Sequence, residues 1–295
     1  MSGIVDAHFH VWRQADLPWL QGPMQPRIFG PYEPLRRDYG IEEYHRDIAG
    51  TGVERAVYVQ ANWAPERAME EVLWVEGEAR RVGFPVAIVA FCDLLAQDAA
   101  HRLEELARRS SVRGVRQQLH WHEIAEYRFA AGPDLACDPR LIESCRRLGE
   151  LGLLFELQVF AGQVESALAL LRACPGTTFV LVHALMLETT DEAGFARWRA
   201  ALARLAAEPN LVCKLSGLNT FVRRLDRALV GRICRTALEL FGPARCLFGS
   251  NFPIEKLWCG YRDLLDAYRA GIGHLAEPDR RAVLSDNARR VYRLD

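Results

Sequence analysis

The sequence lacks any apolar run long enough to cross a membrane. Its longest run, FVLVHALML at 179–187, is interrupted by His183 and falls well short of the roughly 18 residues that a membrane span needs. The first ten residues, MSGIVDAHFH, contain no basic region followed by an apolar stretch, so we expect no secretory signal. These absences predict a cytoplasmic protein that does not bind or span membranes.

The sequence also lacks an excess of charge of either sign. Lys and Arg number 37 and Asp and Glu number 38, which gives a formal net charge of −1. A nucleic-acid binder usually needs a basic face, so we expect no nucleic-acid partner. A small-molecule substrate is the expected partner, and assembly as a homodimer stays open.

The sequence also lacks two kinds of short motif, paired cysteines and glycine-rich nucleotide-binding turns. The eight cysteines never form CxxC and lie mostly in apolar segments such as LVCKL and RCLFG, which favours buried thiols in a reducing compartment over disulfides or a zinc knuckle. Neither GxGxxG nor GxxxxGK[ST] occurs, so the glycine-rich turns of nucleotide-binding open sheets are missing.

Short apolar runs alternate with longer amphipathic stretches along the whole chain. Each run resembles a strand that is buried on both faces, as in a parallel sheet. The eight runs lie at 3–12, 55–63, 85–94, 112–121, 152–160, 177–185, 210–218 and 245–253. The stretches between them have the character of helices, and they lie at 65–83, 98–110, 138–152, 162–176, 195–210 and 225–242.

Eight strands alternating with helices predict an α/β protein, a (β/α)8 TIM barrel, with one domain over residues 1–295. A doubly wound open sheet is the alternative fold. Two connections are long, 16–34 and 122–138, and both follow predicted strands. In a barrel they would overhang the C-terminal ends of the strands, where active sites lie.

The first run contains VDAHFHVW, with His8 and His10 two residues apart. Side chains alternate along a strand, so both imidazoles should point the same way, toward the barrel mouth. Two imidazoles there could hold one metal ion. Asp6 has the same parity one layer deeper, and we expect it to orient a histidine from behind.

Polar residues stand at the ends of the other runs too, as expected if these ends surround a site. Arg116, Gln118 and His120 share one face of the fourth run, and Gln117 lies on its other face. Later runs supply Gln158, His183, Ser216 and Asn251, while Lys214 is a candidate partner for a buried carboxylate such as Glu156. Several tryptophans, Trp12 among them, follow strand ends and are candidates for a rim that contacts substrate.

These segments carry a family resemblance over nearly the whole chain. DAHFH, His183 in LVHAL, KLSGL, FGSNFP and the terminal NARRVYRL together resemble the amidohydrolase-related family of TIM barrels. The nearest branch contains sugar lactonases and 2-pyrone-4,6-dicarboxylate lactonase. The resemblance implies a hydrolase that opens a small cyclic ester, a sugar-derived or aromatic-derived lactone, by attack of water at the barrel mouth.

The family's site carries over only in part. His8, His10 and His183 match the family's histidines and are the candidate metal ligands. Gln158 stands where a histidine ligand is common, and Asn251 stands where the family usually has an aspartate that serves as ligand and base. Three neutral imidazoles and two amides offer no anion to offset the charge of zinc. We therefore expect either no required cofactor or one weakly held divalent ion such as zinc.

The expected mechanism uses imidazole, because an amide is not a base near neutral pH. One of the three histidines would act as base and the others would donate to the developing oxyanion, while Asn251 orients water or substrate. Arg116, with Gln117 or Gln118, would hold a carboxylate or hydroxyls, and Gln158, His120 and Trp12 complete the substrate-binding set. Two alternatives remain: a decarboxylase or hydratase of an unsaturated acid, and a non-catalytic ligand-binding barrel.

Overall fold

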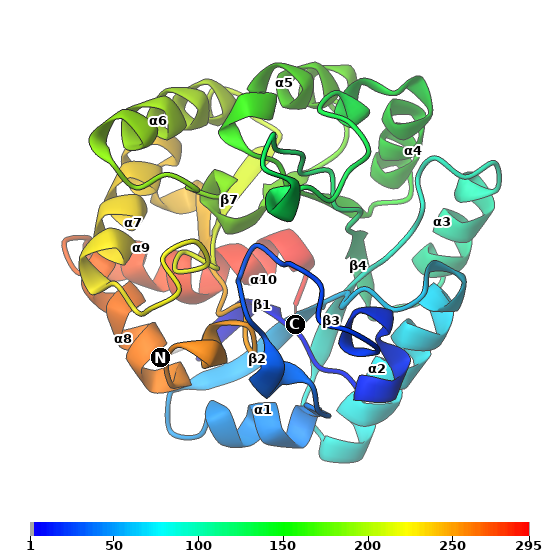
Figure 1. Cartoon of the computed structure of the whole chain (residues 1–295), viewed down its shortest axis with the longest axis horizontal. Helices are drawn as coiled ribbons and strands as arrows, with labels where there is room; N and C mark the ends of the chain where they lie inside the picture. Colours follow the sequence, from blue (N-terminus) through cyan, green and yellow to red (C-terminus); the bar gives the residue numbers. More distant parts are fainter. Residues whose placement is uncertain (1–2, 295) are drawn as a thin grey trace.

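The computed structural model describes residues 3–294 and shows one eight-stranded parallel sheet with strands in sequence order. Helices surround the strands as an outer ring (Figure 1). The strands are β1 (Ile4–Phe9), β2 (Val53–Val59), β3 (Val86–Ala90), β4 (Val112–Val115), β5 (Leu154–Leu157), β6 (Phe179–Leu181), β7 (Leu211–Leu215) and β8 (Cys246–Phe248). The predicted (β/α)8 barrel is confirmed, and each strand lies within one of the predicted runs, β2 alone beginning two residues earlier.

Each predicted helix is present as well. The first helix was not predicted from the sequence, and three more follow the last strand. The helices are α1 (Ile41–Asp47), α2 (Ala68–Val82), α3 (Ala99–Ala107), α4 (Pro139–Glu150), α5 (Val164–Ala173), α6 (Glu192–Ala206), α7 (Arg227–Phe241), α8 (Tyr261–Gly271), α9 (Glu277–Arg281) and α10 (Asn287–Tyr292). Among residues 3–294, none of them is long and apolar enough to cross a bilayer.

Local sequence explains where the helices begin and end. The carboxylate of Asp138 accepts from the backbone N–H of Arg140, and Pro139 follows at the first helical position of α4. Asp191 and Asp226 cap α6 and α7 in the same way. Helix α2 ends at Gly83, whose φ of 70° suits a residue without a side chain.

Apolar side chains form two layers. The larger layer lies between the strands and the helices, and six of the eight cysteines are buried. The smaller layer fills the barrel interior with residues from alternate positions of the strands, closed at one end by Ala288 and Tyr292 of α10. The chain end therefore plugs the barrel opposite the strand ends that carry the polar residues.

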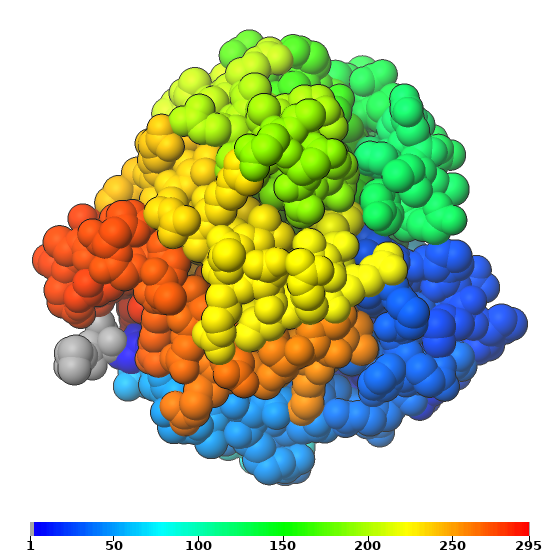
Figure 2. Space-filling model, turned by 60° about the vertical axis from the view of Figure 1, so that its left-hand side comes forward, coloured from blue at the N-terminus to red at the C-terminus, as the bar shows by residue number. Residues whose placement is uncertain are grey.

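The barrel closes between β1 and the segment that follows β8. His10 N–H donates to Phe252 O and Asn251 N–H donates to His8 O, both at 2.7 Å. In the space-filling view the orange and red C-terminal segments lie against the blue and cyan N-terminal ones (Figure 2). The seam of the barrel thus runs through the HxH motif itself.

A bulge in β1 overturns one prediction. Asp6 pairs with Ala56 and Phe9 with Tyr58, so β1 has one more residue than β2 across this interval. The extra residue changes the parity, and Asp6 faces the surrounding helices while His8 and His10 face inward.

The Asp6 carboxylate therefore does not orient an imidazole ring. It accepts from the backbone N–H groups of His8 and Ser250 and from the hydroxyls of Tyr44 and Tyr261. Burial raises the pKa of Asp6, and hydrogen bonds with Ser250 and Tyr44 oppose that rise. Its role is to fix the backbone on both sides of the seam.

Candidate active site

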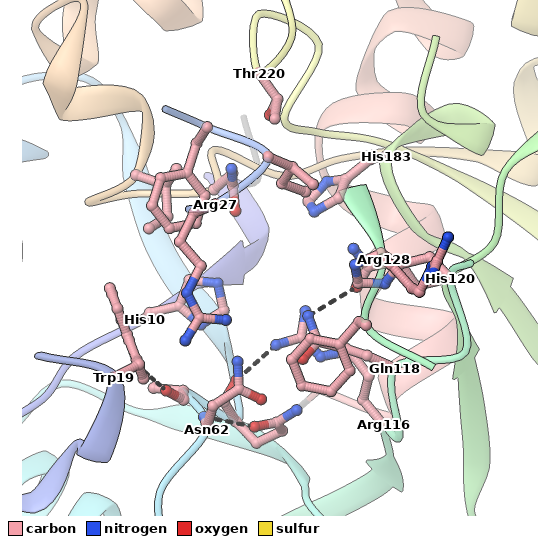
Figure 3. Close-up of a pocket in the computed structure, with 18 of the residues that line it drawn as sticks. His10, Trp19, Arg27, Asn62, Arg116, Gln118, His120, Arg128, His183 and Thr220 are labelled. Carbon is pink, nitrogen blue, oxygen red and sulfur yellow. Dashed lines mark hydrogen bonds between the residues drawn. The ribbon is translucent and has the colours of Figure 1, made fainter. Parts of the chain in front are cut away.

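One cavity opens at the C-terminal ends of the strands, beneath the two long connections (Figure 3). Eight of the residues predicted for the site line it: His10, Trp12, Arg116, Gln118, His120, Gln158, His183 and Asn251. They come from β1, β4, β5, β6 and β8 or from the residues just beyond those strands, which is how a TIM barrel assembles a site from distant parts of the sequence.

Three imidazoles converge at the base of this cavity, as the sequence predicted. The Nε2 atoms of His8 and His10 lie 3.2 Å apart. The ring centres of His8 and His183 lie 4.8 Å apart. His8 is fully buried and does not line the cavity, whereas His10 and His183 reach it.

The tautomer of His10 follows from its partner. Its Nδ1 lies 2.6 Å from the carbonyl oxygen of Val59, which can only accept, so Nδ1 carries the proton. In the neutral ring Nε2 then presents a lone pair. Burial, followed by the charge of Arg116, lowers the pKa of His10 to about 3, so the His10 ring is neutral near pH 7.

His183 is held by an unusual backbone and by one glycine. Its φ of 55° is the first of four consecutive positive values, from His183 to Met186, a costly conformation in residues with side chains. Its Nδ1 lies 2.8 Å from Ser216 Oγ. A Cβ at Gly217 would lie 2.6 Å from that Nδ1, so only glycine fits there. Burial and Arg116 lower the pKa of His183.

His8 is packed against Gly249 of the FGSN segment. A Cβ added at Gly249 would lie 2.7 Å from the Cβ of His8. Its Nδ1 is buried and has no hydrogen-bond partner among the described residues. Burial and the positive charge of Lys214 lower its pKa. His8 therefore supports the cluster from below as a neutral ring.

Lys214 lies inside the barrel in a buried ion pair with Glu156, as the sequence suggested. Nζ donates to Glu156 Oε1 at 2.5 Å, and the hydroxyl of Tyr292 donates to the same oxygen at 2.7 Å. All three side chains are fully buried. Burial lowers the pKa of Lys214 to about 8.

Arg116 supplies a positive charge to the cavity wall. Its Nη2 donates to Gln60 O at 2.6 Å, while its Nε is buried without a partner among the described residues. No carboxylate within residues 3–294 forms an ion pair with it. Gln118 donates to Gln158 at 3.5 Å beside it.

Gln117 is not among the residues that line the cavity, so its predicted role in substrate binding has no support from the structure. It lies on the opposite face of the segment after β4, as strand alternation requires. Its side-chain oxygen accepts from Leu94 N–H, and its nitrogen donates to Asp93. Trp12 lines the cavity but is almost fully buried, with its indole N–H bound to Arg37 O.

Several lining residues were not predicted individually, and they fall mainly on loops. Arg27 and Phe29 come from the first long connection, and Arg128 and Phe129 come from the second. Both connections were expected to overhang the site, but no motif singles out these positions within them. The loop after β7 contributes Thr220, and the segment after β2 contributes Asn62.

The histidine donors match zinc only in part. Two nitrogens bound tetrahedrally to one zinc lie about 3.3 Å apart, close to the separation of the His8 and His10 Nε2 atoms. Within residues 3–294, however, no three His, Cys, Asp or Glu side chains are grouped as a metal site. The His8 Nδ1 also lacks the outer acceptor that orients a ligating histidine. The role of the three histidines as metal ligands therefore stays a prediction.

An eight-stranded parallel barrel with a polar cavity at the C-terminal ends of its strands has the architecture of TIM-barrel enzymes. The family model described as amidohydrolase matches residues 5–294. The chain therefore belongs to the amidohydrolase family, as the resemblance implied.

Individual proteins agree with this assignment. The chain is 30% identical to an L-fucono-1,5-lactonase of Burkholderia ambifaria, over all of this chain and 97% of that protein. A crystal structure of a Burkholderia multivorans amidohydrolase with bound zinc is 28% identical, covers 99% of both chains and has a TM-score of 0.83. A putative 2-pyrone-4,6-dicarboxylic acid hydrolase from Pseudomonas putida shares the fold, at 21% identity over 99% of this chain and 98% of that one, with a TM-score of 0.70.

Proposed function

We propose that the protein is a lactonase that hydrolyses a small cyclic ester at this cavity. The observation that carries the proposal is the hydrogen bond between His10 Nδ1 and Val59 O, which leaves the lone pair on Nε2, in a residue that lines the cavity together with His183 and Arg116. Full-length similarity to a protein named as a lactonase supports the reaction class.

The chemistry follows from these groups. Water attacks the ester carbonyl carbon while His10 Nε2 takes one of its protons. The oxyanion that forms is stabilised by the ring of His183. When the ring C–O bond breaks, the proton on His10 passes to the departing oxygen, which yields the open hydroxy acid and restores the neutral imidazole.

Asn251 is proposed to position the attacking water. Its φ of 58° is one that asparagine tolerates, and hydrogen bonding with its side chain raises the pKa of His10 against the effect of burial. Asn251 itself cannot replace the base, because the lone pair of an amide nitrogen is delocalised.

We propose further that turnover needs no metal, and that any divalent ion at the histidines is weakly held. Support comes from the donor set: two amides stand where the family has a histidine and an aspartate, and His8 has no outer partner. Zinc in the B. multivorans structure belongs to that protein.

The alternative reaction, decarboxylation or hydration of an unsaturated acid, is less well supported. The family resemblance implies that such reactions generally use the aspartate after the eighth strand and a metal, and Asn251 takes that aspartate's place. The non-catalytic alternative predicts ligand binding without turnover. A panel of sugar and aromatic lactones separates the three candidate functions. Acid release from each lactone is measured with protein whose metal content is known. Only hydrolysis that is lost when His10 is replaced supports the lactonase proposal.

A further inference from the structure

The charge of the cavity wall is markedly one-sided. Its ionised groups are the guanidinium groups of Arg27, Arg116 and Arg128 and the single carboxylate of Glu126. The imidazoles do not reverse this, because they are neutral near pH 7. Glu126 is exposed on the outer loop, so the deep part of the cavity is positive.

Arg116 is the deepest of these charges and is 3% exposed. A buried guanidinium is costly unless it is paired. The two carboxylates whose charge acts most on the pKa of Arg116 are bound to other groups. Glu71 accepts from Tyr58 and Ala61, and Glu156 pairs with Lys214. Arg116 thus keeps its charge without a carboxylate partner, and its Nε has no hydrogen-bond partner among the described residues.

Arg27 approaches the same space from the first long loop. Its Nε is buried without a partner among the described residues, and it has no ion pair with any carboxylate in residues 3–294. It lies over the ring of Trp19, with 5.5 Å from Cζ to the ring centre. Arg27 and Arg116 both act on the pKa of His120, and Figure 3 shows both side chains directed into the cavity.

Arg128 differs, because two of its three guanidinium nitrogens donate to the backbone of its own loop. Nε and Nη2 donate to the carbonyl oxygens of His122 and Glu123, and the guanidinium lies over the ring of Trp121. It holds the second long loop in shape. Among the cations that line the cavity, Arg27 and Arg116 are the two whose buried Nε has no partner among the described residues.

We propose that the cyclic ester carries a carboxylate away from its reacting carbonyl, and that Arg116 and Arg27 hold it. The inference rests on the proposed lactonase function and names its substrate class. A guanidinium matches a carboxylate with two parallel hydrogen bonds. A neutral lactone of the same size leaves both guanidinium groups without a carboxylate when it is bound, so it is a poor substrate.

A matched pair of substrates tests this. The 1,5-lactone of a hexonic acid and the 1,5-lactone of the corresponding hexaric acid share one ring and differ in a hydroxymethyl or a carboxylate group. We expect kcat/KM to be about 100-fold higher for the hexaric lactone, the size expected for charge-assisted hydrogen bonds. Equal kcat/KM values would overturn the carboxylate proposal while leaving lactone hydrolysis intact.

Two variants assign the preference to residues. Arg116→Met and Arg27→Met should each lower kcat/KM for the hexaric lactone by at least about tenfold and should narrow the gap between the two substrates. Arg108→Met, an exposed arginine on the outer surface, is the matched control and should change neither value. A loss that is equal for both substrates in both variants would contradict a carboxylate-binding role.

A binding measurement separates the two proposals. The open-chain hexarate should raise Tm of the wild-type protein at millimolar concentration, and the corresponding hexonate should raise it less. If the two acids shift Tm equally in Arg116→Met, the carboxylate site is supported. This holds even if the protein hydrolyses no lactone, and in that case only the lactonase proposal fails. Equal shifts by both acids in every variant would overturn the site.

Discussion

His10 and Val59 form the hydrogen bond that decides the protonation state of the site: His10 Nδ1 donates to Val59 O at 2.6 Å. The bond joins the end of β1 to the last residue of β2. Because a carbonyl oxygen can only accept, the cavity-facing Nε2 is left with its lone pair.

Replacing this base should abolish most turnover. His10→Gln keeps a donor near Val59 O but removes the basic nitrogen, and kcat on the best lactone should fall about 10²- to 10⁴-fold. Steady-state kinetics measures it, with circular dichroism to confirm folding. His101→Gln, an exposed histidine of α3, should be unchanged. Full activity in His10→Gln would assign the base elsewhere.

Lys214 and Glu156 form a buried ion pair, and the effect of replacing one of them on the free energy of unfolding should depend on whether the other is present. Lys214→Met leaves the Glu156 carboxylate buried with only Tyr292 as donor, and should lower the free energy of unfolding by about 3–5 kcal/mol. The double variant Lys214→Met, Glu156→Gln should recover part of that loss, as read from urea midpoints. A double variant no better than the single would show that the charges do not interact.

Glu255 should make stability fall as pH rises. Burial raises its pKa to about 8 from 4.5, although Asn219 donates to it. The folded state therefore binds a proton that the unfolded state has released between these values, and stability contributed by the protonated acid is lost as pH rises from about 4.5 to 8. The slope from this group is at most about 1.4 kcal/mol per pH unit.

Glu255→Gln should remove that slope, since glutamine still accepts from Asn219. Unfolding measured in urea at pH 5 and pH 8 should show a smaller drop for Glu255→Gln than for wild type. Parallel drops in the two proteins would mean that Glu255 is ionised in the folded state.

The seam of the barrel should depend on Asp6, which accepts four hydrogen bonds from β1, α1, α8 and the segment after β8. Asp6→Asn turns an NH2 toward two of those donors and should cost about 2 kcal/mol or more. It should also lower kcat, because the backbone of His8 moves. Asp266→Asn, on the exposed face of α8, is the control for a surface carboxylate. A change as small as the control's would contradict the role of Asp6.

Much of the fold and half of the site were open to prediction, for a physical reason. Strands buried on both faces give continuous apolar runs, and polar residues that interrupt the ends of such runs, like His183 and Arg116, mark the mouth of the barrel. The order of eight runs then fixes which ends meet.

The remainder depends on backbone details that a residue pattern does not encode. The bulge in β1 moves Asp6 to the outer face, although simple alternation places it with His8. Gln117 and Gln118 are a different case, because alternation along the fourth run already separates them, and Gln118 is the one that lines the cavity. Arg27 enters from a loop without periodicity, so its role becomes visible only when its donors and their missing partners are counted.

The central claim, that imidazole rather than a metal drives ester hydrolysis here, is tested most directly by one measurement. Lactone hydrolysis is followed in a pH-stat with protein whose metal content has been assayed before and after chelation. The account predicts turnover that is unchanged by metal removal and is lost in His10→Gln. Turnover that disappears with the metal and returns with one equivalent of zinc would contradict it.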